Sequence, residues 1–469
     1  MQKVSISFFI NGIKYSAEVS PHLSALELLK SLGYTGPKEG CGEGDCGACT
    51  VLLGSMTNGK IEYKTITSCI YPAVRLNGKH IVTSEGLQTN QKLHPVQVSV
   101  LENHATQCGY CTPGIVMSLF GYFYNSDRYD DEGITEALEG NLCRCTGYVS
   151  IRNSARYSAN MFSKQDFPIP DYFDRINQSI KNNKKESYGN DNYFVPTSLS
   201  DLYQIKKFDT IINGGTDLMI AIKHKGFRPE AILDISEIDE LNFIKYQNVF
   251  LEIGSTVTLS QIKNSETIKN YFPVLATTIK QMASLQIRNV ATLAGNIANA
   301  SPIADSTSLL LAADAKLSLI NIYNKSERTI PLSDFFISYK KTNIKKGEII
   351  KSIIIPVKEN FKFSFEKTSK RKAVDISTVN SALALKVENN IITHINLSLG
   401  GIAPTPYLCK TVKNFTGEEL SEETVYKIAE TIKNQIKPIS DIRGSDNYRK
   451  ELVKNHIIKH FYKLFPQIF

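Results

Sequence analysis

Residues 41–49 read CGEGDCGAC, which places Cys41, Cys46 and Cys49 in one short loop, and a fourth cysteine, Cys69, follows twenty positions later. Cysteines spaced this closely can converge on one metal centre only if the chain between them curls tightly. Glycine permits that curl, because it takes positive φ angles and lets the backbone approach a ligand closely. The loop has glycines at positions 40, 42, 44 and 47. We therefore expect these four cysteines to act together as metal ligands.

The spacing C-x4-C-x2-C with a distant fourth cysteine is typical of the plant-type [2Fe–2S] loop. Backbone N–H groups that face such a cluster offset its negative charge and tune its potential. A structural zinc site is the alternative, although zinc sites favour paired C-x2-C units. The first cysteine group is therefore predicted to hold a [2Fe–2S] cluster.

A second group has the spacing C-x2-C…C-x-C, with 31 residues between its two pairs, and consists of Cys108, Cys111, Cys143 and Cys145. Taken alone, this pattern fits zinc, an iron–sulfur cluster or a redox C-x-x-C motif. The neighbouring ferredoxin-like loop favours the iron–sulfur interpretation, because one cluster needs an electron partner. We expect a second [2Fe–2S] cluster here.

The composition is that of an ordinary soluble protein, with 469 residues, 42% of them hydrophobic and 21% charged. The net charge of +8 is spread without a long basic block, so no nucleic-acid partner is expected. No apolar run approaches 18 residues and the N-terminus lacks the apolar core of a signal peptide, so we expect no membrane association and a cytoplasmic location. Clustered cysteines in a reducing compartment indicate metal binding rather than disulfides.

Local patterns predict a small β-grasp-like domain followed by helices. Alternating apolar residues over 4–19 indicate a hairpin that turns at Asn11-Gly12. Ser24 and Glu27 form a capping-box pattern at the start of a helix. Residues 95–163 are expected to be mostly helical, with Thr112 as an N-cap before Pro113, and strands are expected near 50–53 and 61–66.

The rest of the chain alternates strand-like and helical stretches, which predicts α/β or α+β structure from residue 194 onwards. Residues 164–193 are polar and contain two prolines, and we interpret them as a linker. A boundary is expected near 357–362. Beyond it, the pattern predicts strands around 375–386 and 391–399 and helices near 421–434 and 445–462.

Three segments carry a family resemblance: 38–50 (KEGCGEGDCGACT), 107–114 (QCGYCTPG) and 140–148 (GNLCRCTGY). They closely resemble the iron–sulfur domains of the xanthine dehydrogenase family of molybdenum hydroxylases. In that family the helical domain holds the cluster nearest the molybdenum cofactor, and the plant-type cluster stands between it and flavin. The family commonly has Arg-Pro-Ile after the last cysteine pair, where this chain has Val149-Ser150-Ile151. No ligand is lost by this difference, which would affect a local contact to a partner.

Two later segments have the chemistry of a dinucleotide site. Residues 211–218 (IINGGTDL) are an apolar strand that runs into a Gly-Gly turn and a helix cap, where backbone N–H groups can bind a pyrophosphate. Residues 289–305 are rich in small and hydrogen-bonding side chains. A plain strand–helix turn and a buried small-residue helix are the respective alternatives, and the Rossmann fingerprint G-x-G-x-x-G is missing from both segments.

Together these segments resemble the flavin-binding domain of the same family, in the same chain order. The resemblance implies FAD bound along Ile211, Ile212, Asn213, Gly214, Gly215, Thr216, Asp217 and Leu218, and along Thr292, Leu293, Ala294, Gly295 and Asn296. It also implies that Asp305 and Lys367 belong to the FAD site, and that an apolar residue, Met282 or Ile350, lies near the flavin ring. Segments 400–406 and 440–449 resemble the domain that follows FAD in these proteins.

The resemblance implies a multidomain α+β chain in five parts. These are a β-grasp plant-type ferredoxin domain at 1–88, a helical [2Fe–2S] domain at 89–163, the linker at 164–193, a two-part α+β FAD-binding domain at 194–360 and a C-terminal α+β domain at 361–469. This order is that of the small subunit of two-subunit bacterial members of the family.

The resemblance further implies a separate, molybdopterin-binding large subunit that oxidises hypoxanthine and xanthine to urate, in a hetero-oligomer such as a dimer of heterodimers. Electrons would pass through the two clusters and FAD to NAD⁺, and no substrate-hydroxylating residue is expected in this chain. One alternative is the reductase subunit of a related hydroxylase for aldehydes or N-heterocycles. The other, from a different class, is a zinc-stabilised scaffold without redox function.

Overall fold

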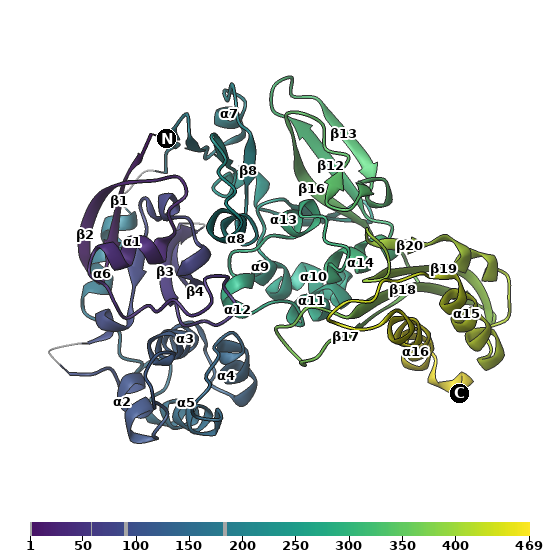
Figure 1. Ribbon diagram of the computed structural model, residues 1–469, viewed down its shortest axis with the longest axis horizontal. Helices are drawn as coiled ribbons and strands as arrows, with labels where there is room; N and C mark the ends of the chain where they lie inside the picture. The colour runs from purple at the N-terminus through teal and green to yellow at the C-terminus, as the bar shows by residue number, and fades with distance from the viewer. Residues whose placement is uncertain (1, 58, 89–91, 182–184) are drawn as a thin grey trace. The chain divides into compact units, whose positions relative to one another are not determined.

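The computed structural model describes residues 2–57, 59–88, 92–181 and 185–469, and Figure 1 traces their path. The chain folds as two compact units. Unit 1 comprises Met1–Asp201, Lys206–Glu237 and Ala283–Ala291, and unit 2 comprises Leu202–Ile205, Ile238–Met282 and Thr292–Phe469. Each unit combines helices with separate sheets, which confirms the predicted multidomain α+β class.

Unit 1 begins with a five-stranded sheet in the order β2-β1-β5-β3-β4. The predicted hairpin is confirmed, because Asn11 and Gly12 join its strands with φ angles of 49° and 90°. The predicted capping box of Ser24 and Glu27 starts the helix that follows. The elements are β1 (Val4–Ile10), β2 (Ile13–Val19), α1 (Ala25–Ser31), β3 (Thr50–Thr57), β4 (Lys60–Thr67) and β5 (His80–Val82).

Four helices follow the sheet: α2 (Pro95–Glu102), α3 (Thr112–Asn125), α4 (Asp131–Leu138) and α5 (Val149–Met161). The apolar helix α3 is the central one, and it packs on β3 and β4 of the sheet. Thr112 was expected as its N-cap, but the helix begins at Thr112 and the cap position falls on Cys111. Pro113 fits this arrangement, because the first helical turn does not need its missing N–H.

The polar segment 164–193 contains a helix, α6 (Tyr172–Lys181), where we expected a linker. Phe173, Ile176 and Ile180 are buried along one face of α6, at the three- and four-residue spacing of a helix. The helix packs against β3 and β4. The many Lys, Asn and Asp residues of the segment concealed this narrow apolar stripe.

The rest of unit 1 contains a small sheet in the order β6-β7-β9-β8, in which β7, β9 and β8 run parallel. Its β8 leads into the short helix α8, as the sequence predicted for residues 211–218. The elements are β6 (Tyr188–Asn190), β7 (Tyr193–Val195), β8 (Thr210–Ile212), α8 (Leu218–His224), β9 (Ile232–Asp234) and, much later in the chain, α12 (Leu285–Arg288).

Unit 2 contains an antiparallel sheet in the order β10-β11-β16-β12-β13. Its strands are β10 (Ile244–Gln247), β11 (Phe250–Gly254), β12 (Lys316–Asn321), β13 (Glu327–Pro331) and β16 (Glu348–Pro356), and a small pair is formed by β14 (Phe336–Ser338) and β15 (Lys341–Thr342). The helices are α9 (Leu259–Asn264), α10 (Glu266–Tyr271), α11 (Pro273–Lys280), α13 (Leu293–Ala298) and α14 (Asp305–Ala312).

A second antiparallel sheet, in the order β17-β18-β19-β20, completes unit 2. Helices α14 and α16 pack on it, and α15 packs on α16 around a core of aliphatic side chains. The elements are β17 (Lys362–Thr368), β18 (Val379–Glu388), β19 (Ile391–Gly400), β20 (Tyr407–Cys409), α15 (Glu422–Gln435) and α16 (Asp446–Leu464). Strands β18 and β19 and helices α15 and α16 lie close to the predicted ranges, whereas β17 and β20 were not predicted. Within the described ranges, none of the helices has the length and apolarity needed to cross a membrane.

Candidate iron–sulfur and flavin sites

The structure brings the four cysteines of the first group together. The side chain of Cys41 interacts with those of Cys46 and Cys69, and the side chain of Cys49 interacts with that of Cys69. Backbone N–H groups also point at the sulfur: those of Glu43 and Asp45 each lie 3.3 Å from Cys41 Sγ. Amide donors around a thiolate are what a negatively charged cluster requires, so this donor set fits the predicted [2Fe–2S] group.

Glycine is required at two places in this loop. A Cβ atom on Gly40 would lie 2.7 Å from Cys46 Sγ, so a side chain there would displace a predicted ligand. Gly47 has a φ of +67°, and a Cβ atom on it would lie 2.3 Å from the carbonyl oxygen of Gly140. The loop therefore needs glycine both to form its curl and to lie against the second cysteine segment.

The second group is also brought together, from two separate parts of the chain. The side chain of Cys111 interacts with that of Cys143, and the side chain of Cys108 interacts with that of Cys145. Two donors of Thr146 approach Cys143 Sγ, its backbone N–H at 3.5 Å and its hydroxyl at 3.2 Å. Each cysteine of the pair 108/111 therefore lies beside one cysteine of the pair 143/145.

The protonation of these thiols reflects their mutual proximity. Hydrogen bonds from Cys46 and Cys69 lower the pKa of Cys41 far below its ordinary value, and the hydrogen bond with Cys41 raises the pKa of Cys46. Burial and the hydrogen bond with Cys143 raise the pKa of Cys111 to about 12. In the contact between Cys41 and Cys46, one thiol ionises more easily at the expense of the other, whereas a bound metal stabilises all of its cysteine ligands as thiolates.

In the part of the chain that the structure describes, no three His, Cys, Asp or Glu side chains form a group that could hold a metal ion. In the first group the contacts run from Cys46 through Cys41 and Cys69 to Cys49, whereas the second group consists of two close pairs. A [2Fe–2S] cluster takes four thiolates on two irons, so it requires two from the chain for each iron.

The two cysteine segments touch directly through their backbones. The N–H of Leu142, the residue before Cys143, donates a hydrogen bond of 2.9 Å to the carbonyl oxygen of Cys46. One hydrogen bond therefore links a predicted ligand of the first cluster, Cys46, to the residue before a predicted ligand of the second, Cys143.

The predicted flavin turn lies in unit 1, where β8 ends at Ile212 and α8 begins after Asp217. Gly215 has a φ of +79°, which glycine adopts without strain. At its other end, α8 reaches the first cysteine loop: Lys223 pairs with Glu39, and His224 Nε2 lies 3.2 Å from the carbonyl oxygen of Gly42.

The apolar face of α8 packs against two cysteines of the first group. Met219 and Ile222 are buried against Cys49 and Cys69, together with Ile70. A single short helix thus connects the predicted flavin turn with two of the predicted cluster ligands.

The second predicted flavin segment lies in unit 2 and starts α13. Thr292 caps this helix by accepting a hydrogen bond of 3.1 Å from the N–H of Gly295. Asn296 Oδ1 accepts a hydrogen bond of 2.8 Å from Ser306. The side chains of Leu293 and Ala294 are buried, and they anchor the helix rather than presenting polar atoms.

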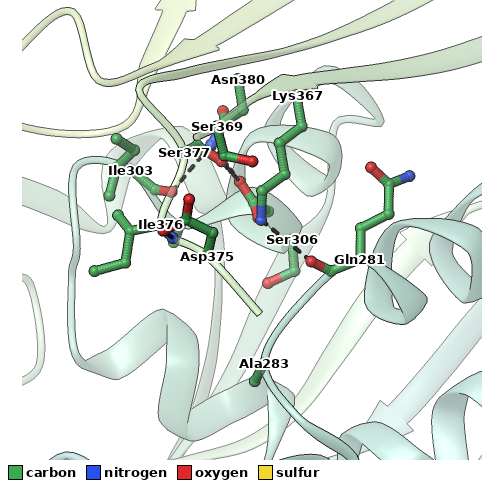
Figure 2. Close-up of polar contacts among 12 residues, drawn as sticks. Gln281, Ala283, Ile303, Ser306, Lys367, Ser369, Asp375, Ile376, Ser377 and Asn380 are labelled. Atoms are coloured by element: carbon green, nitrogen blue, oxygen red, sulfur yellow. Dashed lines mark hydrogen bonds and ion pairs between the residues drawn. The ribbon is translucent and has the colours of Figure 1, made fainter. Parts of the chain in front are cut away.

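Asp305 is the centre of a buried polar cluster in unit 2, and Figure 2 labels three other residues of that cluster, Lys367, Ser377 and Asn380. One of its carboxylate oxygens accepts from Lys367 Nζ at 2.7 Å, and the other accepts from Ser377 and Asn380 at 2.6 and 2.7 Å. Lys367 also donates to the carbonyl oxygen of Gln281 at 3.2 Å, and Figure 2 shows its side chain extending to that turn. The structure therefore brings together Asp305 and Lys367, which the sequence placed 62 residues apart.

The two apolar candidates occupy different surroundings within unit 2. Met282 follows Gln281 directly and is buried. Ile350 is also buried and lies in β16, opposite Leu319 of β12. Only Met282 is thus placed beside a residue that contacts Lys367.

Sequence reasoning missed a buried arginine next to the predicted flavin turn. Arg75 forms an ion pair with Asp234 and donates to the carbonyl oxygens of Asn213 and Gly214. Burial acts to lower the pKa of Arg75, but the charge of Asp234 outweighs burial and raises it. No motif marks these residues, because their partners are distant in sequence.

Four family models match the chain in order. They are the "2Fe-2S iron-sulfur cluster binding domain" over residues 8–73, the "[2Fe-2S] binding domain" over 83–156, the "FAD binding domain in molybdopterin dehydrogenase" over 186–358 and the "CO dehydrogenase flavoprotein C-terminal domain" over 364–464. Two [2Fe–2S] domains and one FAD-binding domain are therefore present.

Whole-chain comparisons agree. The xanthine dehydrogenase of Emericella nidulans is 30% identical over 99% of this chain and 39% of its own length. Aldehyde oxidase 3 of Rattus norvegicus is 28% identical over 98% of this chain and 39% of its own. Quinoline 2-oxidoreductase from Pseudomonas putida 86 shares the fold, with a TM-score of 0.54 and 24% identity over 59% of this chain and 96% of that one.

Together with the cysteine and flavin segments, these matches show that the chain belongs to the molybdenum hydroxylase family, as an iron–sulfur and FAD-binding part. The chain spans about two fifths of the length of the curated relatives it matches.

Proposed function

We propose that this chain carries electrons from a molybdenum centre to NAD⁺ and does not itself hydroxylate the substrate. The clusters would supply one-electron steps, and FAD would convert them into two-electron hydride chemistry with the nicotinamide. The observation that carries the proposal is the continuity of the predicted cofactor segments in unit 1: Leu142 bonds to Cys46, and α8 runs from the Gly214-Gly215 turn to the first cysteine group.

The residues of this chain set the order of transfer. We propose Cys108, Cys111, Cys143 and Cys145 as ligands of the first electron acceptor, and Cys41, Cys46, Cys49 and Cys69 as ligands of the second. The amides of Glu43 and Asp45 would stabilise the added negative charge at the second cluster. The backbone contact between Cys46 and Leu142 would shorten the route between the two.

FAD is proposed to bind along residues 211–218 and 292–296, with Asp305, Lys367 and Met282 as further contacts. Backbone N–H groups of a Gly-Gly turn suit a pyrophosphate. The buried pair of Lys367 and Asp305 offers an ammonium donor and a carboxylate acceptor, and Lys367 is held in place by its second bond to the carbonyl oxygen of Gln281.

We further propose that the molybdopterin is bound by a partner subunit, and that the assembly is a cytoplasmic hetero-oligomer such as a dimer of heterodimers. Xanthine and hypoxanthine are the favoured substrates of that partner, because xanthine dehydrogenases are among the relatives that match almost the whole chain. An aldehyde is the second candidate, favoured by the similarity to aldehyde oxidase 3.

Two measurements test the proposal: the cofactor content and NADH oxidation of the purified chain, and the substrate that the co-purified complex oxidises. The purified chain should contain about four irons and one FAD, oxidise NADH with an artificial acceptor and leave xanthine unchanged. The co-purified complex should oxidise xanthine with NAD⁺. Zinc in place of iron would favour the scaffold alternative, and xanthine turnover by the chain alone would contradict the proposed division of labour. Turnover of aldehydes but not of xanthine by the complex would move the assignment to the second candidate.

A further inference from the structure

Arg75 is a fully buried arginine that reaches from the iron–sulfur part of unit 1 to the predicted flavin turn. It lies in the short helical segment Ala73–Leu76, shortly after Cys69, and its side chain is 2% exposed. Its Nε and Nη2 atoms bind the two carboxylate oxygens of Asp234 at 2.6 and 2.7 Å, in the forked geometry that arginine forms with carboxylates.

The same guanidinium also binds the main chain of the turn. Nη1 donates to the carbonyl oxygen of Gly214 at 3.2 Å, and Nη2 donates to that of Asn213. Asp234 is held in turn by the hydroxyl of Tyr193, at 2.5 Å. The turn is thus held by hydrogen bonds from a buried ion pair, in addition to its connection with helix α8.

These contacts fix the direction in which the turn presents its amides. In a trans peptide the C=O and the following N–H point to opposite sides. Because Arg75 binds the carbonyl oxygens of Asn213 and Gly214, the N–H groups of Gly214 and Gly215 point away from Arg75. An anion-binding turn needs its N–H groups held on one side, and two consecutive carbonyls bound to a single arginine produce that arrangement.

We propose that Arg75 is a positioning residue for FAD: it holds the Gly214-Gly215 turn with its amides presented to the pyrophosphate, so that FAD affinity depends on a residue of the iron–sulfur domain. This inference rests on the proposed function, in which residues 211–218 bind FAD. Arg75 itself does not touch the cofactor in this proposal. It acts through the carbonyl oxygens of the turn.

The decisive variant removes the arginine without leaving a buried charge behind. Arg75→Met alone leaves the buried carboxylate of Asp234 without a cation. The unpaired charge would destabilise the fold whether or not Arg75 positions the turn. The double variant Arg75→Met/Asp234→Asn removes both charges while the turn still loses its donors. If Arg75 is only a structural residue, the double variant should recover FAD binding along with stability. If it positions the turn, iron content and thermal stability should recover while the Kd for FAD stays at least tenfold higher than in the wild-type chain.

Two further measurements keep the proposal testable. Without FAD, hydrogen exchange of residues 213–217 should be at least tenfold faster in the double variant than in the wild type. Arg75→Lys keeps the charge opposite Asp234 but lacks the fork, so it should raise the Kd at least threefold even if the other variants fold poorly. The matched control is Lys79→Met, which breaks the nearby pair with Glu237 (2.6 Å) but does not touch the turn, and it should stay within twofold of wild type.

Different outcomes would contradict the proposed function and the role of Arg75. A wild-type chain with a full complement of iron that binds no FAD would contradict the proposed function itself. A wild-type chain that binds FAD, with Arg75→Lys and the double variant binding equally well, would overturn the role of Arg75 alone.

Discussion

The side-chain amide of Asn141 donates a hydrogen bond of 3.1 Å to the carbonyl oxygen of Gly47, so that one buried side chain ties the second cysteine segment to the first. Its other end accepts from Ser118 at 2.7 Å and from Gln286 at 3.2 Å. The last of these residues comes from the segment Ala283–Ala291, which joins unit 1 from far along the chain. This network supports the backbone contact between Leu142 and Cys46.

We expect Asn141→Ala to weaken the coupling between the two clusters. The carbonyl of Gly47 and the hydroxyl of Ser118 lose a buried partner, which should cost about 1–3 kcal/mol of stability. Electron paramagnetic resonance of the fully reduced chain should show a weaker spin–spin interaction between the clusters. Asn125→Ala is the control, because Asn125 also binds two carbonyl oxygens, of Tyr63 and Gly121, but does not contact a cysteine loop. An equal change of the spectrum in both variants would contradict the prediction.

We expect Cys46→Ser and Cys143→Ser each to remove one cluster and to spare FAD binding. The two cysteines belong to different four-cysteine groups, so each variant should lose one of the two resonance signals. Cys409→Ser is the control, because Cys409 is buried beside Thr411 and lies outside both groups. Loss of both signals from a folded single variant would argue against two independent clusters.

Lys367→Met should destabilise unit 2 by about 3 kcal/mol, because it leaves the buried carboxylate of Asp305 without its cation. Adding Asp305→Asn should restore most of that stability, whereas FAD affinity should remain low in both variants. Urea unfolding and FAD fluorescence measure the two effects separately. Lys351→Met breaks a more exposed ion pair with Glu327, and it should cost no more than about 1 kcal/mol. Full FAD affinity in the double variant would remove Lys367 and Asp305 from the proposed site.

Acid should destabilise unit 2 below pH 6.5 through its buried histidines. Burial lowers the pKa of His456 from 6.5 to about 4 and that of His460 well below its ordinary value. Both are held by hydrogen bonds to the hydroxyl of Ser381. Since the folded state binds fewer protons than the unfolded state between these pKa values, the stability present above pH 6.5 is lost as the pH falls towards 4.

For His456 this loss is about 2 kcal/mol at pH 5 relative to pH 7.5. Thermal or urea unfolding at the two pH values measures it, and His456→Gln should make the dependence shallower. A variant that keeps the full dependence would show that other groups are responsible.

Neutralising residues 370–372, the sequence Lys-Arg-Lys, should raise the KM for NADH several-fold at low salt. The three side chains are exposed, in the loop after β17 that begins just beyond Lys367. An exposed positive field attracts the pyrophosphate of NADH and is screened as the ionic strength rises. The rate with a saturating artificial donor should hardly change.

The control for this experiment removes the same number of charges elsewhere on unit 2, at the exposed residues Lys413, Lys427 and Lys437. If the KM for NADH is unchanged at low salt in the variant neutralised at residues 370–372, these residues form an ordinary solvated turn.

Local signals in the sequence predicted the local structure well. The Asn11-Gly12 hairpin and the capping box of Ser24 and Glu27 are correct because a few neighbouring residues determine them. The N-cap of α3 differs by one residue, and α6 was hidden in a segment whose polar residues outnumber its apolar stripe. Helix α6 was missed because the average composition of a segment does not show that one face of a helix is apolar while the other is polar.

The sequence alone determined the two sets of cysteines, because ligand spacing is a local property that chemistry constrains tightly. Only the tertiary structure could show that Arg75 binds Asp234 and the carbonyl oxygens of the predicted flavin turn, or that Asn141 binds Gly47. These partners lie between 94 and 159 residues apart, and a buried charge or amide finds its partner through the packing of whole elements. The cysteine spacing therefore predicts which groups this protein binds, whereas long-range packing decides how its segments are held together.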